Sequence, residues 1–182
     1  MMNHDNTLQK ISWDTPTMAE LFLRQGNPHR ALAVYRHVFK NRPNDAGIRV
    51  RLAELEEAYG GRDLNFTKPL QDLVENVAGC TACTLMGFDG VPLGSFEVGT
   101  EFDAHGLFVE SAITLQQLQR LLQAQPVGNV TQLVVHTEQA VLVLHPLNAQ
   151  YFVAAVLKPE AIVGKASYLL RRIAPRLLEA LA

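Results

Sequence analysis

Two cysteines stand three residues apart in the segment Cys80-Thr-Ala-Cys83, which is the spacing of a redox pair or of half a zinc site. A zinc site would need a second such pair, and the chain has no other cysteine. We expect the segment to be a β-strand, on which residues three apart point to opposite faces. The two thiols should then be unable to share a metal or form a disulfide, and we interpret them as small buried residues.

The remaining candidates for chemistry also favour a protein without catalytic residues. The six histidines show no spacing typical of metal ligands. The segment Gly87-Phe-Asp-Gly90 lacks the lysine and hydroxyl residue of a phosphate-binding loop and predicts a turn. Arg120 has the side chain of an arginine finger, but an ordinary surface role on a helix explains it much better. We therefore predict a protein that is not an enzyme and that needs no metal and no cofactor.

Composition excludes several other classes of protein. The 182 residues are 48% hydrophobic and 19% charged, with a net charge of −2. This balance is typical of a folded chain and argues against a broad nucleic-acid interface or a polybasic membrane surface. The first residues are polar, and no apolar run is long enough for a spanning helix. We expect a cytoplasmic protein that binds no nucleic acid and does not insert into a membrane.

Charge divides the chain into two parts of different character. The first 68 residues carry 10 Lys and Arg against 8 Asp and Glu, whereas the remaining 114 carry only 6 against 10. Between Pro126 and Leu157 the only charged side chain is Glu138, which predicts a largely buried stretch. Two glycines at Gly60 and Gly61 mark the joint. The expected organisation is a disordered N-terminus (1–14), a helical module (15–60), a linker (61–66) and a second domain (67–182).

The helical module is predicted to hold three helices. They should span Thr17 to Gln25, then Pro28 to Asn41, and then a segment capped by Asn44. The first two resemble a tetratricopeptide repeat, whose small, aromatic, glycine and proline positions hold Ala19, Phe22, Gly26, Ala31, Tyr35 and Pro43. Only one repeat is visible, and such repeats usually need about three copies to bury a continuous core. The module should either dock a partner through Phe22, Tyr35 and Phe39 or be a plain helical extension.

Beyond residue 67 the pattern predicts an α+β domain with the order α-β-β-α-β-β-β-α. Thr67 should cap the first helix, and Asp89-Gly90 should form a two-residue hairpin turn with both residues at positive φ. Pro175 should kink or end the last helix near Ala174. The two other helices are predicted at Ala104 to Gln125 and from Lys158 onward. The five strands should form an antiparallel sheet and are predicted at Cys80 to Met86, Val91 to Phe96, Val130 to His136, Ala140 to Leu144 and Tyr151 to Leu157.

This domain resembles the Roadblock (dynein light chain) family. Residues 79–95 look like its opening hairpin, 142–157 like its central hairpin and 161–166 like the start of its last helix. The resemblance implies a non-enzymatic protein that dimerises through its central helix and third strand. It also implies binding to Ras-like small GTPases, as in the bacterial polarity members, which accelerate hydrolysis without inserting an arginine.

The predicted third strand supports a dimer independently of that resemblance. Val130 to His136 contains no Pro, Lys, Arg, Asp or Glu, and an edge strand without such residues is open to pairing. Closing it against a second copy gives the commonest kind of symmetric contact. A homodimer or a heterodimer with a paralogue is therefore expected, with the interface formed by Phe108, Ala112, Val130, Thr131, Gln132, Leu133 and Val134.

The long central helix carries two sets of residues. One should cover the sheet and comprises Leu107, Phe108, Leu115, Leu118, Leu121 and Leu122. The other is a stripe of Val109, Ile113, Gln116 and Arg120, which would contact either the partner's copy of the helix or a GTPase. In the second case Val109→Glu should abolish GTPase binding.

The expected function is regulation or scaffolding on a Ras-like GTPase, with the helical module docking another protein. The alternative is an adaptor that binds other Roadblock proteins or a signalling or motor complex and has no effect on a GTPase.

Overall fold

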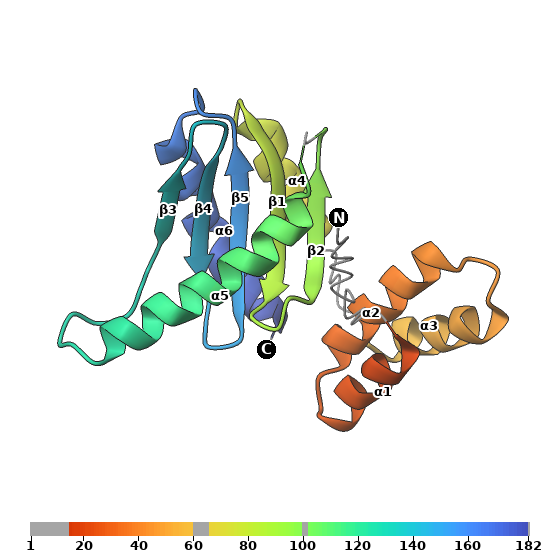
Figure 1. Cartoon of the computed structure of the whole chain (residues 1–182). Coiled ribbons are helices and arrows are strands. Elements are labelled where there is room, and N and C mark those ends of the chain that lie inside the picture. Colours follow the sequence, from red (N-terminus) through yellow and green to blue (C-terminus); the bar gives the residue numbers. More distant parts are fainter. Residues whose placement is uncertain (1–14, 60–65, 100–101, 182) are drawn as a thin grey trace, which may run out of the picture. The chain divides into compact units, whose positions relative to one another are not determined.

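The computed structural model describes residues 15–59, 66–99 and 102–181, and the chain divides into two compact units between Ala58 and Tyr59 (Figure 1). The predicted disordered N-terminus at 1–14 and residues 61–65 of the predicted linker at 61–66 lie outside the described residues.

The first unit is a bundle of three helices: α1 (Pro16–Arg24), α2 (Pro28–Asn41) and α3 (Ala46–Tyr59). Thr15 caps α1 by accepting the amide of Met18, and Pro28 begins α2, where no amide donor is needed. The expected cap of α3 was wrong by one residue. Asp45, not Asn44, accepts the amides of Gly47 and Ile48, at 3.0 and 3.2 Å. The apolar core consists of Ala19, Phe22, Ala31, Leu32, Val34, Tyr35, Val38, Ile48, Leu52 and Leu55.

The second unit has the predicted order of elements. These are α4 (Thr67–Asn76), β1 (Cys80–Gly87), β2 (Pro92–Glu97), α5 (Ala104–Gln123), β3 (Leu133–His136), β4 (Val141–Pro146), β5 (Tyr151–Leu157) and α6 (Val163–Leu181). The strands form one antiparallel sheet in the order β2-β1-β5-β4-β3, which confirms the predicted α+β class.

Helices cover both faces of this sheet, with α5 on one face and α4 and α6 on the other (Figure 1). β5 lies in the middle of the sheet and is buried along its whole length. Its continuously apolar sequence reflects this double coverage. β2 and β3 are left as the two edges.

The hairpin between β1 and β2 is present, but its turn differs from the prediction. Among the described residues only glycines have positive φ, so Asp89 does not, whereas Gly90 has φ of 83°. The amide of Gly90 donates to the carbonyl of Gly87, and that of Gly87 donates to the carbonyl of Val91, both at 2.9 Å. The loop therefore has three residues, a right-handed turn followed by a left-handed glycine, which suits the twist of the strands equally well.

Several boundaries also differ. Thr67 is the first residue of α4 and Phe66 occupies the cap position, without a side-chain hydrogen bond. β3 begins at Leu133 rather than Val130, and α5 ends at Gln123.

The last helix begins later than expected and continues past its proline. α6 begins at Val163 rather than at Lys158, and Ile162 ahead of it is 72% exposed. Pro175 does not end α6, which runs on to Leu181 because Ala174 and Leu177 on either side of the proline are buried.

Candidate functional site

Helix α5 divides into a buried face and an accessible flank. It is capped by Asp103, whose carboxylate accepts the amide of Gly106 at 2.9 Å. Phe108 and Ala112 are buried in the core that α5 forms with the sheet. Their expected role at a dimer interface is therefore revised, because their side chains contact the domain's own sheet and leave no surface for a partner.

The predicted stripe on α5 is split by the fold. Val109 is half-buried against the core, and its two Cγ atoms lie 3.5 Å from the position that a Cβ on Gly90 would take. Val109 thus packs on the β1–β2 turn, and replacing it with glutamate would damage the fold as well as any interface. Ile113, one turn later, is 48% exposed, so its side chain is accessible to another protein.

The rest of the stripe lines a hollow beside the β4–β5 turn. Gln116 and Arg120 lie there with Asn148, and the hollow has a volume of about 460 Å³. Many of its lining residues carry amide side chains, and Arg120 adds a guanidinium. Arg120 is exposed and makes no ion pair with any residue that the structure describes. Such a lining offers hydrogen-bond donors and acceptors to a protein loop, but it holds no nucleophile or acid–base pair.

Strand β3 is an edge with free backbone groups. The amide of Thr137 donates to the carbonyl of Ala140, which fixes where the β3–β4 hydrogen bonds fall. In an antiparallel pair only every second residue of a strand forms such bonds with its neighbour. The alternation directs the backbone groups of Val134 and His136 away from β4, toward the open side. Neither a proline nor a charged residue stands in Leu133–His136 to block pairing.

The other predicted interface residues lie around this edge in different settings. Val130 and Leu133 pack partly into the core under α5, whereas Thr131 is exposed ahead of the strand. The Gln132 amide donates to the Ser167 hydroxyl at 2.6 Å, so its side chain is held by α6. Val135, which the sequence prediction did not single out, is 38% exposed; its pairing with the buried Leu142 puts it on the same face of the sheet as α5.

The C-terminal end of α5 continues past the sheet at the β3 edge (Figure 1). Leu121, expected to cover the sheet, is instead 65% exposed. Leu118 and Leu122 are half-buried. The exposed Leu121 therefore belongs to the part of α5 that passes the open strand.

The two cysteines lie on one face of β1, contrary to the prediction. A bulge between Cys80 and Ala82 shifts the register, so that Cys80 pairs with Leu157 and Cys83 with Ala155. Leu157 and Ala155 stand two residues apart on β5 and therefore point to the same face of the sheet, as do the cysteines paired with them. Burial raises the pKa of Cys80 to about 12 and that of Cys83 well above its ordinary value. Both thiols are therefore protonated and poorly nucleophilic. Within 15–59, 66–99 and 102–181 no cluster of metal-ligating side chains occurs.

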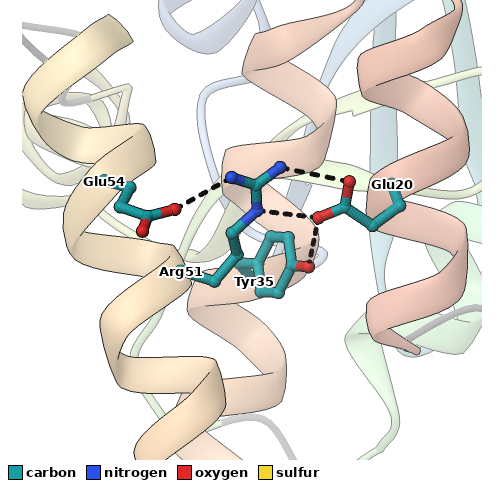
Figure 2. Close-up of polar contacts among 4 residues, drawn as sticks. All are labelled: Glu20, Tyr35, Arg51 and Glu54. Atoms are coloured by element: carbon teal, nitrogen blue, oxygen red, sulfur yellow. Dashed lines mark hydrogen bonds and ion pairs between the residues drawn. The ribbon is translucent and has the colours of Figure 1, made fainter.

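The helical unit has one polar network, which joins all three of its helices (Figure 2). Arg51 on α3 binds Glu20 on α1 and Glu54 one turn along α3, and the Tyr35 hydroxyl on α2 donates to Glu20 at 2.8 Å. The hydrogen bond from Arg51, with that from Tyr35, lowers the pKa of Glu20. Burial, with the bond to Glu20, raises the pKa of Tyr35.

Two of the three residues expected to dock a partner belong to the core of the helical unit. Phe22 and Tyr35 are buried, and only Phe39 is partly accessible. The exposed apolar side chains of this unit are instead Leu21 and Val50, with Tyr59 at its end.

Comparison with known proteins separates the two units in the same way. Residues 15–55 match the tetratricopeptide repeat family. No curated protein matches the chain. No helix in the described part of the chain combines the length and apolar character needed to cross a bilayer.

Solved structures resemble the C-terminal part. A Roadblock/LC7 domain from Streptomyces avermitilis is 16% identical with a TM-score of 0.58, over 64% of this chain and 98% of that one. The gliding protein MglB from Thermus thermophilus is 16% identical with a TM-score of 0.56, over 63% and 86%. A structure described as MglB with tetrameric arrangement is 17% identical with a TM-score of 0.57, over 63% and 85%. The second unit therefore has the Roadblock/LC7 fold, as the sequence resemblance implied, and the first contains a tetratricopeptide repeat.

Proposed function

We propose that this chain is a non-enzymatic regulator or scaffold in the cytoplasm, which pairs with a second copy through β3 and binds a Ras-like small GTPase on α5. The observation that carries the proposal is the combination, in one unit, of an exposed flank of α5 around Ile113 with an edge strand, β3, that nothing in the described part of the chain blocks. A surface built of one apolar residue, amides and a guanidinium suits recognition of another protein.

The dimer is supported by the chemistry of the edge. The backbone groups of Val134 and His136 face outward with no described residue placed to receive them, and a second copy of β3 would provide complementary groups. One structural neighbour is described as having a tetrameric arrangement, which agrees with self-association of this fold.

Dimerisation would also enlarge the binding surface on α5. Two antiparallel copies of β3 in one continuous sheet are related by a twofold axis perpendicular to that sheet. Both copies of α5 would then lie on the same face, with Ile113, Gln116 and Arg120 contributed twice. A GTPase contacting both copies would bury more surface than one subunit offers. The gliding protein among the neighbours suggests a role in bacterial polarity or motility.

The helical unit would recruit a further protein. Within the described residues the helical unit holds one tetratricopeptide repeat, and no second repeat there buries its outer surface. Because Phe22 and Tyr35 are core residues, docking would use the exposed side chains Leu21 and Val50 together with Phe39.

The proposal is tested by mixing the purified protein with Ras-like GTPases of its host organism, each loaded with GTP or GDP. Complex formation is followed by fluorescence anisotropy of a labelled nucleotide and hydrolysis by phosphate release. Regulation predicts binding that depends on the nucleotide. Binding indifferent to the nucleotide, with unchanged hydrolysis, would instead identify an adaptor. Complex formation only with a paralogue, and with no GTPase of the panel, would contradict the proposal.

A further inference from the structure

The face of the sheet opposite α5 carries a second hollow, between α4 and α6. Its volume is about 720 Å³, and each helix contributes one stripe to it. The α4 stripe consists of Lys68, Pro69, Asp72, Leu73 and Asn76, and the α6 stripe of Lys165, Leu169, Arg172, Ile173 and Arg176. We call this feature the α4–α6 groove.

The rims of the groove are cationic. Lys68 stands on the α4 side, and Lys165, Arg172 and Arg176 stand on the α6 side. Asp72 is the one carboxylate among the described lining residues, and it forms an ion pair with Lys68 at 3.3 Å. Within the described residues Lys165 and Arg176 form no ion pair. The guanidinium of Arg172 lies over the Tyr168 ring, 5.9 Å from its centroid, which keeps its charge available to a ligand.

This concentration of positive charge stands out because its surroundings are acidic. Residues 69–182 contain 6 Lys and Arg against 10 Asp and Glu, and four of those six cations are on α6. Three of the four line the groove, and Arg171 does not. Clustered unpaired cations on an otherwise acidic domain attract a negatively charged ligand.

The floor of the groove is apolar. Pro69 and Ile173 are its half-buried side chains, whereas Leu73 and Leu169 are buried. None of the described residues that line the groove is aromatic, so they offer no ring on which a base would stack, which disfavours a single-stranded nucleic acid.

We propose that the α4–α6 groove docks an acidic, amphipathic segment of a partner protein. Apolar side chains of the segment would contact the floor, and its carboxylates would bind the cations of the rims. The stripe from Lys165 to Arg176 is about 16 Å long, which matches a helical segment of about 11 residues. The groove lies on the opposite face from α5, so this docking does not depend on the proposed GTPase surface.

The test uses the full-length protein and a fluorescein-labelled peptide of alternating glutamate pairs and leucine pairs, about 12 residues long. Saturable binding should be measured by anisotropy, and raising NaCl from about 0.05 M to about 0.3 M should weaken it. The double variant Arg172→Glu, Arg176→Glu should lower affinity about tenfold or more, since both contacts are replaced by repulsion. A peptide with glutamine in place of glutamate should not bind measurably.

Arg171→Glu is the matched control, because it reverses a charge on the same helix outside the groove. It should change affinity less than about twofold, and circular dichroism should show that all variants remain folded. Equal losses from Arg171→Glu and the double variant would indicate nonspecific attraction and overturn the proposal. So would binding of the unlabelled protein to phosphatidylglycerol vesicles that is stronger than its binding to the peptide.

Discussion

Arg51 on α3 binds both carboxylate oxygens of Glu20 on α1: Nε lies 2.8 Å from Oε1 and Nη2 lies 3.2 Å from Oε2. Within the segment that matches the tetratricopeptide repeat family, this two-point contact joins the first helix to the third (Figure 2). The Tyr35 hydroxyl adds a contact from α2, so all three helices meet at one carboxylate.

Glu20→Gln should loosen this helical unit. The amide keeps the size of the side chain but loses the charge that Arg51 pairs with, and the pair is partly exposed and therefore screened. We expect a loss of about 0.5–1 kcal/mol, measured as faster amide hydrogen exchange in α1 and α3 of the full chain. Glu56→Gln is the control, because Glu56 makes one contact with Arg36 at a more exposed site. Equal effects of the two changes would show that the network adds nothing beyond an ordinary surface pair.

The same carboxylate should make the helical unit sensitive to acid. The hydrogen bonds from Arg51 and Tyr35 hold the pKa of Glu20 below the ordinary value of 4.5. A lowered pKa in the folded state gives stability that is fully present above the unfolded value and is lost as the pH falls through the folded one. The protection factors of the α1 amides, which correct for the intrinsic pH dependence of exchange, should therefore fall below about pH 4.5, and Glu20→Gln should reduce this dependence. An unchanged pH profile in the variant would contradict the assignment.

Gly94 on β2 should tolerate no side chain. A Cβ there would lie 2.8 Å from Phe66 Cβ and 3.1 Å from the Phe66 carbonyl carbon, so the start of α4 would have to move. We expect Gly94→Ala to lower the free energy of unfolding of the second unit by about 1–3 kcal/mol, measured by urea denaturation.

Gly164→Ala provides the matched control in the same unit. No atom lies within 4 Å of its Cβ position, and alanine favours helix α6. It should leave stability unchanged or raise it by about 0.5–1 kcal/mol. A stable Gly94→Ala variant would mean that α4 does not approach β2 as closely as described.

Val135→Lys should abolish self-association. A lysine on an edge strand is a common natural block to pairing, and Val135 is exposed on β3. Sedimentation equilibrium should show a dimer for the unmodified protein and a monomer for this variant. Ser95→Lys places the same residue at an exposed position of β2, the opposite edge, and should remain dimeric. Loss of the dimer in Ser95→Lys alone would place the interface on β2.

The order of elements could be predicted from the sequence because hydrophobic periodicity reports burial directly. The apolar run of β5 predicted a central strand, and Pro28 and Asp89-Gly90 predicted the start of α2 and the hairpin. The faces of individual residues were harder to predict. The bulge in β1 that brings the cysteines to one face arises from pairing with β5, and no local signal marks it.

The residues of α5 show why a helical stripe does not define a site. A helix of 20 residues is about 30 Å long, whereas five strands span about 19 Å between the first and last. The last turns of α5 therefore extend beyond the sheet and leave Leu121 exposed. Val109 is covered by a turn more than fifteen residues earlier in the chain, and this contact exists only in the folded domain.

The α5 surface is tested most directly by Ile113→Glu, with Thr114→Glu as its control. Both positions are exposed, but they lie about 100° apart around the helix, and only Ile113 belongs to the proposed surface. The measurement is the affinity of each dimeric variant for the GTP-loaded Ras-like GTPase that the unmodified protein binds. Our account predicts that Ile113→Glu weakens binding about tenfold or more while Thr114→Glu changes it little. A normally folded Ile113→Glu dimer that binds the GTPase with unchanged affinity would contradict it.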